Sequence, residues 1–301
     1  MLLRKLTSVC FMAVLFFSAG ITHAEDMLKP FILASTTGND MASVVSEVKN
    51  KLATAGFEQV GEYSPYVDAT VIIVTSSALK SAAAKSEFGG YAVGQRVSVT
   101  KVNGEVQVAY TNPVYMANAY RMNEDLADVA VALQAALGNL EAYGSGEGLA
   151  VKKIRKYHYM FGMEYFDDPT VLARYDSHQQ ALDAVEQALA AKKGGVSKVY
   201  RIDVPGKDET VFGVHLTEEC SSDEFIMGHI DFKPVRSTAH LPYEMLVSGK
   251  RVYALYARFR IAINFPDLKM MGDNSFLKIM CSPVAIKDAL KLAAGKEAKN
   301  N

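Results

Sequence analysis

Histidine, cysteine and aspartate side chains in the last third of the chain could in principle bind a metal ion. They are His215, Cys220, His229, Asp231 and His240. No pair has the i, i+4 or Cys-x-x-Cys spacing that positions ligands in advance. Surface and turn histidines are the commoner explanation of such a pattern. The nearby methionines would suit a soft metal such as Cu(I), but flexible gap-filling in an apolar interior is their commoner role. We assign no metal ligand and no cofactor from the sequence.

Two arginines of the same region could bind an anion. Arg258 and Arg260 alternate with Phe259, Ile261 and Ile263, an alternation typical of a strand with one buried face. We therefore expect both arginines on the face opposite the core, where a guanidinium fork suits a carboxylate or a phosphate.

Two further groups of polar residues complete the candidate ligand-binding set. The first lies in a segment expected to be an insertion and consists of His240, Tyr243 and Glu244. The second belongs to the basic stretch Lys152 to Tyr159, which is either a solvated interdomain segment or an anion-binding lip, and consists of Lys153, Arg155 and His158. Acid/base chemistry would need facing partners, so no catalytic residue is assigned and the sequence favours a protein that is not an enzyme.

Cys220 and Cys281 are the cysteines that remain once a predicted signal peptide is removed. Export would place them where disulfides persist, and a bridge would close a loop of about 60 residues. Two buried free thiols or a redox pair are the alternatives, the latter without a supporting Cys-x-x-Cys motif.

The first 24 residues have the pattern of a secretory signal peptide. Arg4 and Lys5 precede an apolar stretch from Leu6 to Ile21, and small residues lead to Ala24. The uninterrupted apolar part is far shorter than the roughly 20 residues that a membrane anchor needs. We expect cleavage before Glu25, a periplasmic or secreted mature protein, and no transmembrane segment after signal removal.

Composition excludes some classes of protein. The chain is 50% hydrophobic and 22% charged, with a formal net charge of -1. A nucleic-acid-binding protein of this size usually carries a basic excess, which this chain lacks. We therefore expect no nucleic acid as a partner. The mature length has room for two domains.

The two halves of the chain repeat one another. Lys29 to Ala34 is echoed by Asp168 to Ala173, and a helical pattern at Val44 to Leu52 returns 137 positions later. The strand Val71 to Val74 returns after 140 positions, and Asn112-Pro113 after 170, as Ser282-Pro283. The jump in offset predicts an insertion near 218–250 in the second copy.

Each copy gives a β-α-β-β-β-β-α order, with a hairpin at Asn103-Gly104, whose residues both tolerate positive φ. Strands that follow one another without crossover helices favour antiparallel pairing. We therefore expect an α+β protein of two β-α-β4-α units, each an antiparallel sheet with helices on one face. The units span 25–122 and 165–295, and a helical connector, 123–164, contains a helix from Asn123 to Gly144.

The first copy resembles the domain-of-unknown-function 302 family, the TT1751-like domains. The likeness rests on the helix ending in Gly56-Phe57, the strand pair after it and the Asn112-Pro113 turn. It implies the β-α-β4-α unit also found in each half of the TATA-binding protein, and it brings no catalytic residue. The second copy departs from the pattern, with Gly194-Gly195 and Ser282 at the matching places.

The expected function is a non-enzymatic module that binds a small anionic or amphipathic molecule, because such pockets favour domain junctions. Two alternatives stay open. One is an envelope structural or interaction protein, and the other is an enzyme with its site in the second unit.

Overall fold

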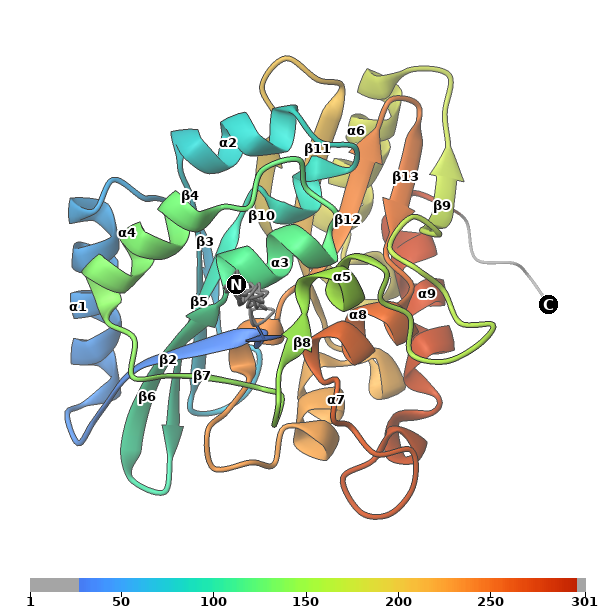
Figure 1. Ribbon diagram of the computed structural model, residues 1–301. Coiled ribbons are helices and arrows are strands. Elements are labelled where there is room, and N and C mark those ends of the chain that lie inside the picture. Colours follow the sequence, from blue (N-terminus) through green and yellow to red (C-terminus); the bar gives the residue numbers. More distant parts are fainter. Residues whose placement is uncertain (1–26, 297–301) are drawn as a thin grey trace, which may run out of the picture.

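The computed structural model describes residues 27–296 of the chain (Figure 1). The predicted signal peptide and its cleavage site before Glu25 lie outside these residues. The strands of the first half are β1 (Met27–Leu28), β2 (Phe31–Thr37), β3 (Glu58–Tyr63), β4 (Ala69–Thr75), β5 (Gln95–Val102), β6 (Glu105–Thr111), β7 (Glu141–Tyr143) and β8 (Leu149–Ala150). Those of the second half are β9 (Thr170–Arg174), β10 (Val196–Asp203), β11 (Glu209–Leu216), β12 (Tyr243–Ser248) and β13 (Arg251–Ala254).

The helices alternate with these strands. The α-helices are α1 (Met41–Thr54), α2 (Ser77–Ala84), α3 (Pro113–Ala119), α4 (Ala127–Leu137), α5 (Val151–Arg155), α6 (His178–Ala190), α7 (Asp223–Ile230), α8 (Ala257–Asn264) and α9 (Ser282–Ala293). Short 3-10 helices are η1 (Gly89–Ala92), η2 (Lys193–Gly195), η3 (Glu219–Ser221), η4 (Thr238–His240) and η5 (Phe276–Ile279).

Two antiparallel sheets occupy the centre of the described chain, and the α+β fold class is confirmed. The first sheet has the order β3-β4-β5-β6-β2-β7 and the second has the order β10-β11-β12-β13-β9. The two orders correspond. When β2 to β6 are numbered 1 to 5, the first sheet contains the order 2-3-4-5-1, and when β9 to β13 are numbered 1 to 5, the second sheet has the same order. β4 and β11 hold the same place in that order.

The local sequence explains why α1 and the β5–β6 hairpin form where they were predicted. Asp40 caps α1 by accepting a hydrogen bond from the Ser43 backbone N–H, and the chain leaves that helix through Gly56 at φ +83°. Asn103 and Gly104, both at positive φ, connect β5 to β6 as a two-residue hairpin. These signals are local, so they need no knowledge of the rest of the fold.

The sheets pack face to face between two layers of helices. Figure 1 shows α1 and α4 on one flank, α6 and α9 on the other, and the strands between them. Inward-facing residues of the second sheet, among them Tyr200, Val211 and Leu246, belong to the same core cluster as the first sheet. A separate core cluster lies between the second sheet and its helices. Each sheet therefore has an inner face against the other sheet.

The connector differs from the predicted long helix. α4 ends at Leu137, because Gly138 adopts φ +101°, and the chain then adds β7 to the edge of the first sheet beside β2. Leu140, expected on the apolar face of the helix, is exposed. Leu140 keeps the helical spacing of the apolar residues before it, but the chain there forms backbone hydrogen bonds with β2 and does not continue the helix.

The predicted insertion at 218–250 is wrong in its extent. It contains α7 and η4, but its last part is β12, an inner strand of the second sheet. Cys281 and Ser282 do not follow a strand, because η5 precedes α9. The Ser-Pro match was misleading, since a proline suits the first turn of any helix.

Candidate functional site

The two candidate arginines lie on a helix and not on a strand. Arg258 and Arg260 belong to α8, and they do not share a solvent face. Arg260 is 1% exposed, whereas the side chain of Arg258 is 40% exposed. The expectation that neither faces the core is therefore wrong for Arg260. Nearly every residue of α8 is buried, so the segment lacks the polar face that marks a helix in sequence.

Arg260 is the centre of a buried polar network. Its guanidinium donates to the backbone carbonyl oxygens of His240, at 2.6 Å, and Pro242. It also lies 3.0 Å from His240 Nε2 and 4.5 Å from the centre of the Tyr243 ring. A stacked, multiply bonded arginine of this kind cannot be replaced by lysine without loss of contacts.

Glu244 joins this network to the first sheet. Its Oε1 accepts hydrogen bonds from Arg96, at 3.0 Å, and from the Tyr200 hydroxyl, at 2.9 Å. Glu244 Oε2 lies 3.8 Å from Arg260 Nε, a charge contact longer than a hydrogen bond. Gly213 permits the arrangement, because the Tyr200 ring covers it and a Cβ would lie 1.8 Å from that ring.

The electrostatics of the network follow from burial. Burial is the largest single effect on Arg96 and opposes its charge, but the Glu244 carboxylate and the neighbouring Tyr120 and Tyr200 together raise the pKa of Arg96. Burial, followed by the neighbouring Arg260 and Arg96, holds the pKa of His240 well below its usual range. Two guanidinium groups therefore share one carboxylate beside a neutral imidazole.

This arrangement suits stability better than catalysis. An acid/base pair of His240 and Glu244 would need the two side chains in mutual contact in a cleft. Instead Arg260 contacts both of them, and their exposed fractions are 2% and 3%. Tyr243 is equally buried and donates its hydroxyl to the Leu255 carbonyl oxygen at 2.6 Å.

A second polar cluster ties the edge strand β3 to α7. The Tyr63 hydroxyl donates to Asp223 Oδ2 at 3.1 Å, and His215 Nε2 lies 4.0 Å from the same oxygen. Burial lowers the pKa of His215, so this contact is not an ion pair at neutral pH. Burial also raises the pKa of Asp223 to about 7, although the hydrogen bond from Tyr63 acts in the opposite direction.

The raised pKa of Asp223 gives a pH-dependent prediction. A carboxyl whose folded pKa exceeds its unfolded value stabilises the protein fully below about pH 4, and this contribution is lost as pH rises toward 7. Because one pKa unit equals about 1.4 kcal/mol, the cost at pH 8 is at most about 4 kcal/mol. Asp223→Asn should therefore raise the unfolding free energy by about 1–2 kcal/mol at pH 8 and change it little at about pH 4.

Urea denaturation at the two pH values measures this difference. Asp208→Asn, at an exposed position, is the matched control and should leave the unfolding free energy unchanged at both pH values. An equal effect of Asp223→Asn at both pH values would contradict the raised pKa.

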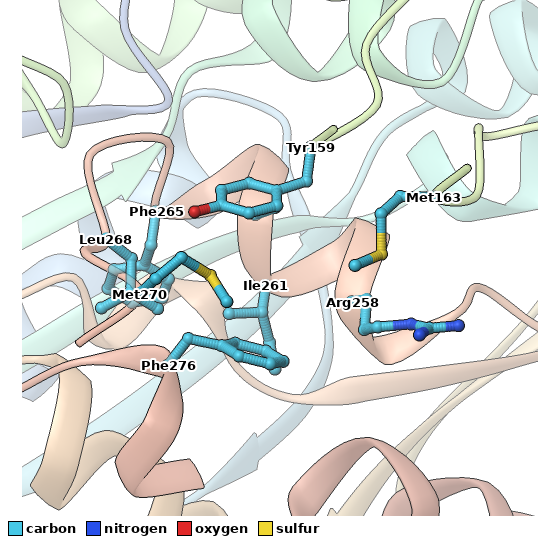
Figure 2. Close-up of a pocket in the computed structure, with 9 residues that line it drawn as sticks. Tyr159, Met163, Arg258, Ile261, Phe265, Leu268, Met270 and Phe276 are labelled. Carbon is cyan, nitrogen blue, oxygen red and sulfur yellow. The ribbon is translucent and has the colours of Figure 1, made fainter. Parts of the chain in front are cut away.

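Arg258 lines a different feature, an apolar slot between the connector and the second half of the chain (Figure 2). Tyr159 and Met163 form one wall of it, from the segment that follows α5. The remaining lining residues come from α8 and the chain after it: Arg258, Ile261, Ala262, Phe265, Leu268, Met270 and Phe276. In Figure 2 Arg258 lies at the Met163 end, away from the group around Phe265. It pairs with Glu164.

The slot is narrow and adjoins a wider cleft. Its free volume is about 20 Å³, or about 360 Å³ when the space open to solvent is included. The cleft, of about 590 Å³, shares Phe265 and Leu268 with it, and its lining also includes Lys233 and Lys269. A ligand in the slot must therefore displace side chains, which the flexible Met163 and Met270 allow.

The other sequence candidates are dispersed. Lys153 is exposed on α5, and Arg155 donates to the Met122 carbonyl oxygen at 3.1 Å. His158 Nδ1 lies 2.8 Å from the Met160 carbonyl oxygen. None of the three lines the slot. The sequence reasoning missed Tyr159 and Met163, although the methionines of this region were a signal for an adaptable apolar site.

Cys220 and Cys281 form a disulfide, with Cα atoms 5.9 Å apart. Among residues 27–296, no group of three or more His, Cys, Asp or Glu side chains could hold a metal ion. No helix in that range is long and apolar enough to cross a membrane. Comparisons with protein-family models, with curated proteins and with solved structures gave no match.

Proposed function

We propose that the chain is an exported, non-enzymatic protein that binds an amphipathic anion, such as a long-chain carboxylate, in the slot. The two halves would be related units of the TT1751-like type, a proposal supported by the order 2-3-4-5-1 that both sheets contain. The slot would then belong to the second unit and the connector. It has no counterpart in the repeat, because the chain between α8 and α9 is much longer than that between α3 and α4.

The slot itself carries the proposal. Its walls are almost wholly apolar, as binding sites for small molecules usually are, and two of its side chains are methionines that can rearrange around an apolar chain. The narrow free volume suits an unbranched chain better than a ring. Its position at the connector agrees with the preference of pockets for domain junctions.

Arg258 supplies the charge for the head group. One guanidinium N–H group bonds to Glu164, and the side chain is 40% exposed. A guanidinium has five N–H donors, so a carboxylate at the rim of the slot could bind without displacing Glu164. The buried network around Arg260 lies on another side of α8 and serves stability in this proposal.

A charge placed in the slot should abolish binding. Met163→Asp should lower the affinity for a fluorescent long-chain fatty acid by a factor of about ten or more, because the carboxylate would be desolvated beside the apolar chain. Met160→Asp, at a residue of the same turn that does not line the slot, is the control. Fluorescence titration measures both, and wild-type affinity in Met163→Asp would rule out this site.

The role of Arg258 is separable from that of the apolar walls. Arg258→Ala should weaken binding of the fatty acid about fivefold, which corresponds to about 1 kcal/mol for an exposed charged hydrogen bond. It should leave binding of the matching fatty alcohol unchanged. Arg251→Ala, at an exposed arginine on β13, is the control. Equal losses for acid and alcohol would contradict recognition of a head group.

A further inference from the structure

Each end of α7 carries a buried carboxyl group. Asp223 is the first residue of the helix and Asp231 follows its last residue, and their exposed fractions are 2% and 8%. The Tyr63 hydroxyl, from β3 of the first half, donates to Asp223 at 3.1 Å. The Ser237 backbone N–H donates to both oxygens of Asp231, at 2.9 and 3.0 Å. Hydrogen bonds satisfy these carboxyl groups only in part, so their ionisation in the buried position is costly.

Few charged groups face Asp223. His215 of β11 lies 4.0 Å from its carboxyl group, and burial lowers the pKa of this histidine. Arg260 of α8 favours the charged form of Asp223, but burial has the larger effect and raises the pKa of Asp223 to about 7. The short helices η3 and η5 pack against α7, and their charged residues Glu219 and Lys278 are exposed. Burial therefore decides the charge of Asp223.

The surroundings of Asp231 act in the same way. Arg236 favours the charged form, but its guanidinium donates to the backbone carbonyl oxygen of Asp231 and not to the carboxylate. Burial raises the pKa of the neighbouring Tyr66 and Tyr143, which therefore stay neutral. Burial also raises the pKa of Asp231 to about 7. The C-terminal end of a helix disfavours a negative charge as well.

Side chains of the first half hold the chain that follows α7. The backbone–backbone hydrogen bonds of residues 231–238 connect positions only a few residues apart. The bonds to the first half involve side chains and are 2.7–3.0 Å long, and the partners are Tyr66, Thr100, Gln107 and Tyr143. A segment that is attached in this way, without a strand ladder, opens more easily than the sheets do.

The segment that can open has defined ends. We call α7 and the chain after it, residues 223–238, the α7 segment. Cys220, just before it, is bonded to Cys281, and Tyr243, just after it, begins β12. A second cleft, of about 520 Å³, is lined both by Gly228 of α7 and by Tyr66 of the first half. Solvent therefore already reaches the boundary between the α7 segment and the first half.

We propose that the α7 segment is a pH-controlled latch, which is closed on the first half while Asp223 and Asp231 are protonated and opens when they ionise. Ile226 and Ile230 pack in the core of the second half and favour the closed form. The open form exposes both carboxyl groups to water and binds fewer protons. Opening therefore becomes easier as pH rises from about 4 to about 7, and it levels off above that range.

The latch would also regulate the slot. Ile230 and Asp231 line the wider cleft, which shares Phe265 and Leu268 with the slot. Opening of the α7 segment should therefore weaken binding in the slot at alkaline pH. This consequence rests on the proposed function, whereas the latch itself does not.

Hydrogen exchange of the ligand-free protein at pH 5 and pH 8 tests the latch, with rates corrected for the pH dependence of intrinsic exchange. Protection of residues 223–238 should be at least about tenfold lower at pH 8, because each carboxyl group contributes up to about tenfold per pH unit. Protection of the inner strand β4 should stay higher than that of the α7 segment at both pH values, since the opening is local.

Variants assign the effect to the two carboxyl groups. Asp223→Asn, Asp231→Asn should keep the α7 segment protected at both pH values, because an amide cannot ionise. Each single variant should remove part of the pH dependence, and these serve if the double variant does not fold. Asp208→Asn, Asp288→Asn, at exposed positions, is the matched control and should retain the pH dependence of the wild type.

Three outcomes would overturn the proposal. The first is equal protection of the wild-type α7 segment at both pH values. The second is a loss of protection that β4 shares in full, which would indicate global unfolding. The third is a pH dependence that persists in the double asparagine variant, which would assign the titration to another group, such as Glu224 or His229 on α7 itself. A failure of the fatty-acid titration would change none of these results, because they are measured without ligand.

Discussion

Replacing Arg260 with alanine should lower the free energy of unfolding by about 3–5 kcal/mol, the usual cost of removing one partner from a buried ionic network. The change leaves Glu244 without one of its two cations. It also removes the donor that serves the carbonyl oxygens of His240 and Pro242. Unpartnered buried acceptors carry their full desolvation cost.

Arg258→Ala is the matched control, because it removes the same side chain two positions away. Arg258 is partly exposed and pairs with Glu164, and such pairs contribute about 1 kcal/mol or less. Urea denaturation of both variants provides the comparison. If Arg260→Ala does not fold, Glu244→Gln keeps the shape of the side chain while removing its charge, and it should cost at least about 2 kcal/mol. Equal effects at Arg258 and Arg260 would refute the buried network.

The contrast between these arginines shows where sequence reasoning stopped. The alternation in Arg258 to Ile263 fits a strand, yet Phe259 and Ile263 are also four residues apart, as on one helix face. The partner that draws Arg260 inside is Glu244, on β12, which in turn binds Arg96 at a separation of 148 residues. Pairing across two sheets leaves no periodic signal in either segment.

Elements that are determined by neighbouring residues in the sequence were predicted correctly. The Asn103-Gly104 hairpin and the apolar positions Val44, Val48 and Leu52 of α1 are as expected. The slot could not be found in this way, because the chain from Phe265 to η5 has no helical or strand repeat and its wall is completed by Tyr159 and Met163, about a hundred residues earlier. Only the composition of that stretch, rich in methionine and phenylalanine, hinted at an adaptable surface.

The disulfide should have the other large effect on stability. Cys220 in η3 and Cys281 at the start of α9 are 61 residues apart in sequence. A cross-link of this span stabilises the folded state by about 4 kcal/mol through the entropy of the unfolded chain. Cys220→Ser, Cys281→Ser should therefore lower the unfolding free energy by about 2–5 kcal/mol, and reductant should do the same to the wild type.

The same bond should also control the slot. Cys281 follows η5 closely, and Phe276 at the start of η5 lines the slot with Met270. Without the bond, the chain from Leu268 to Met280 loses its tie to η3, so limited proteolysis should cut there faster and fatty-acid affinity should fall. Reductant should have no further effect on the double-serine variant, which serves as the control. A variant that loses less than about 1 kcal/mol and keeps its protease resistance would show that packing alone holds this wall in place.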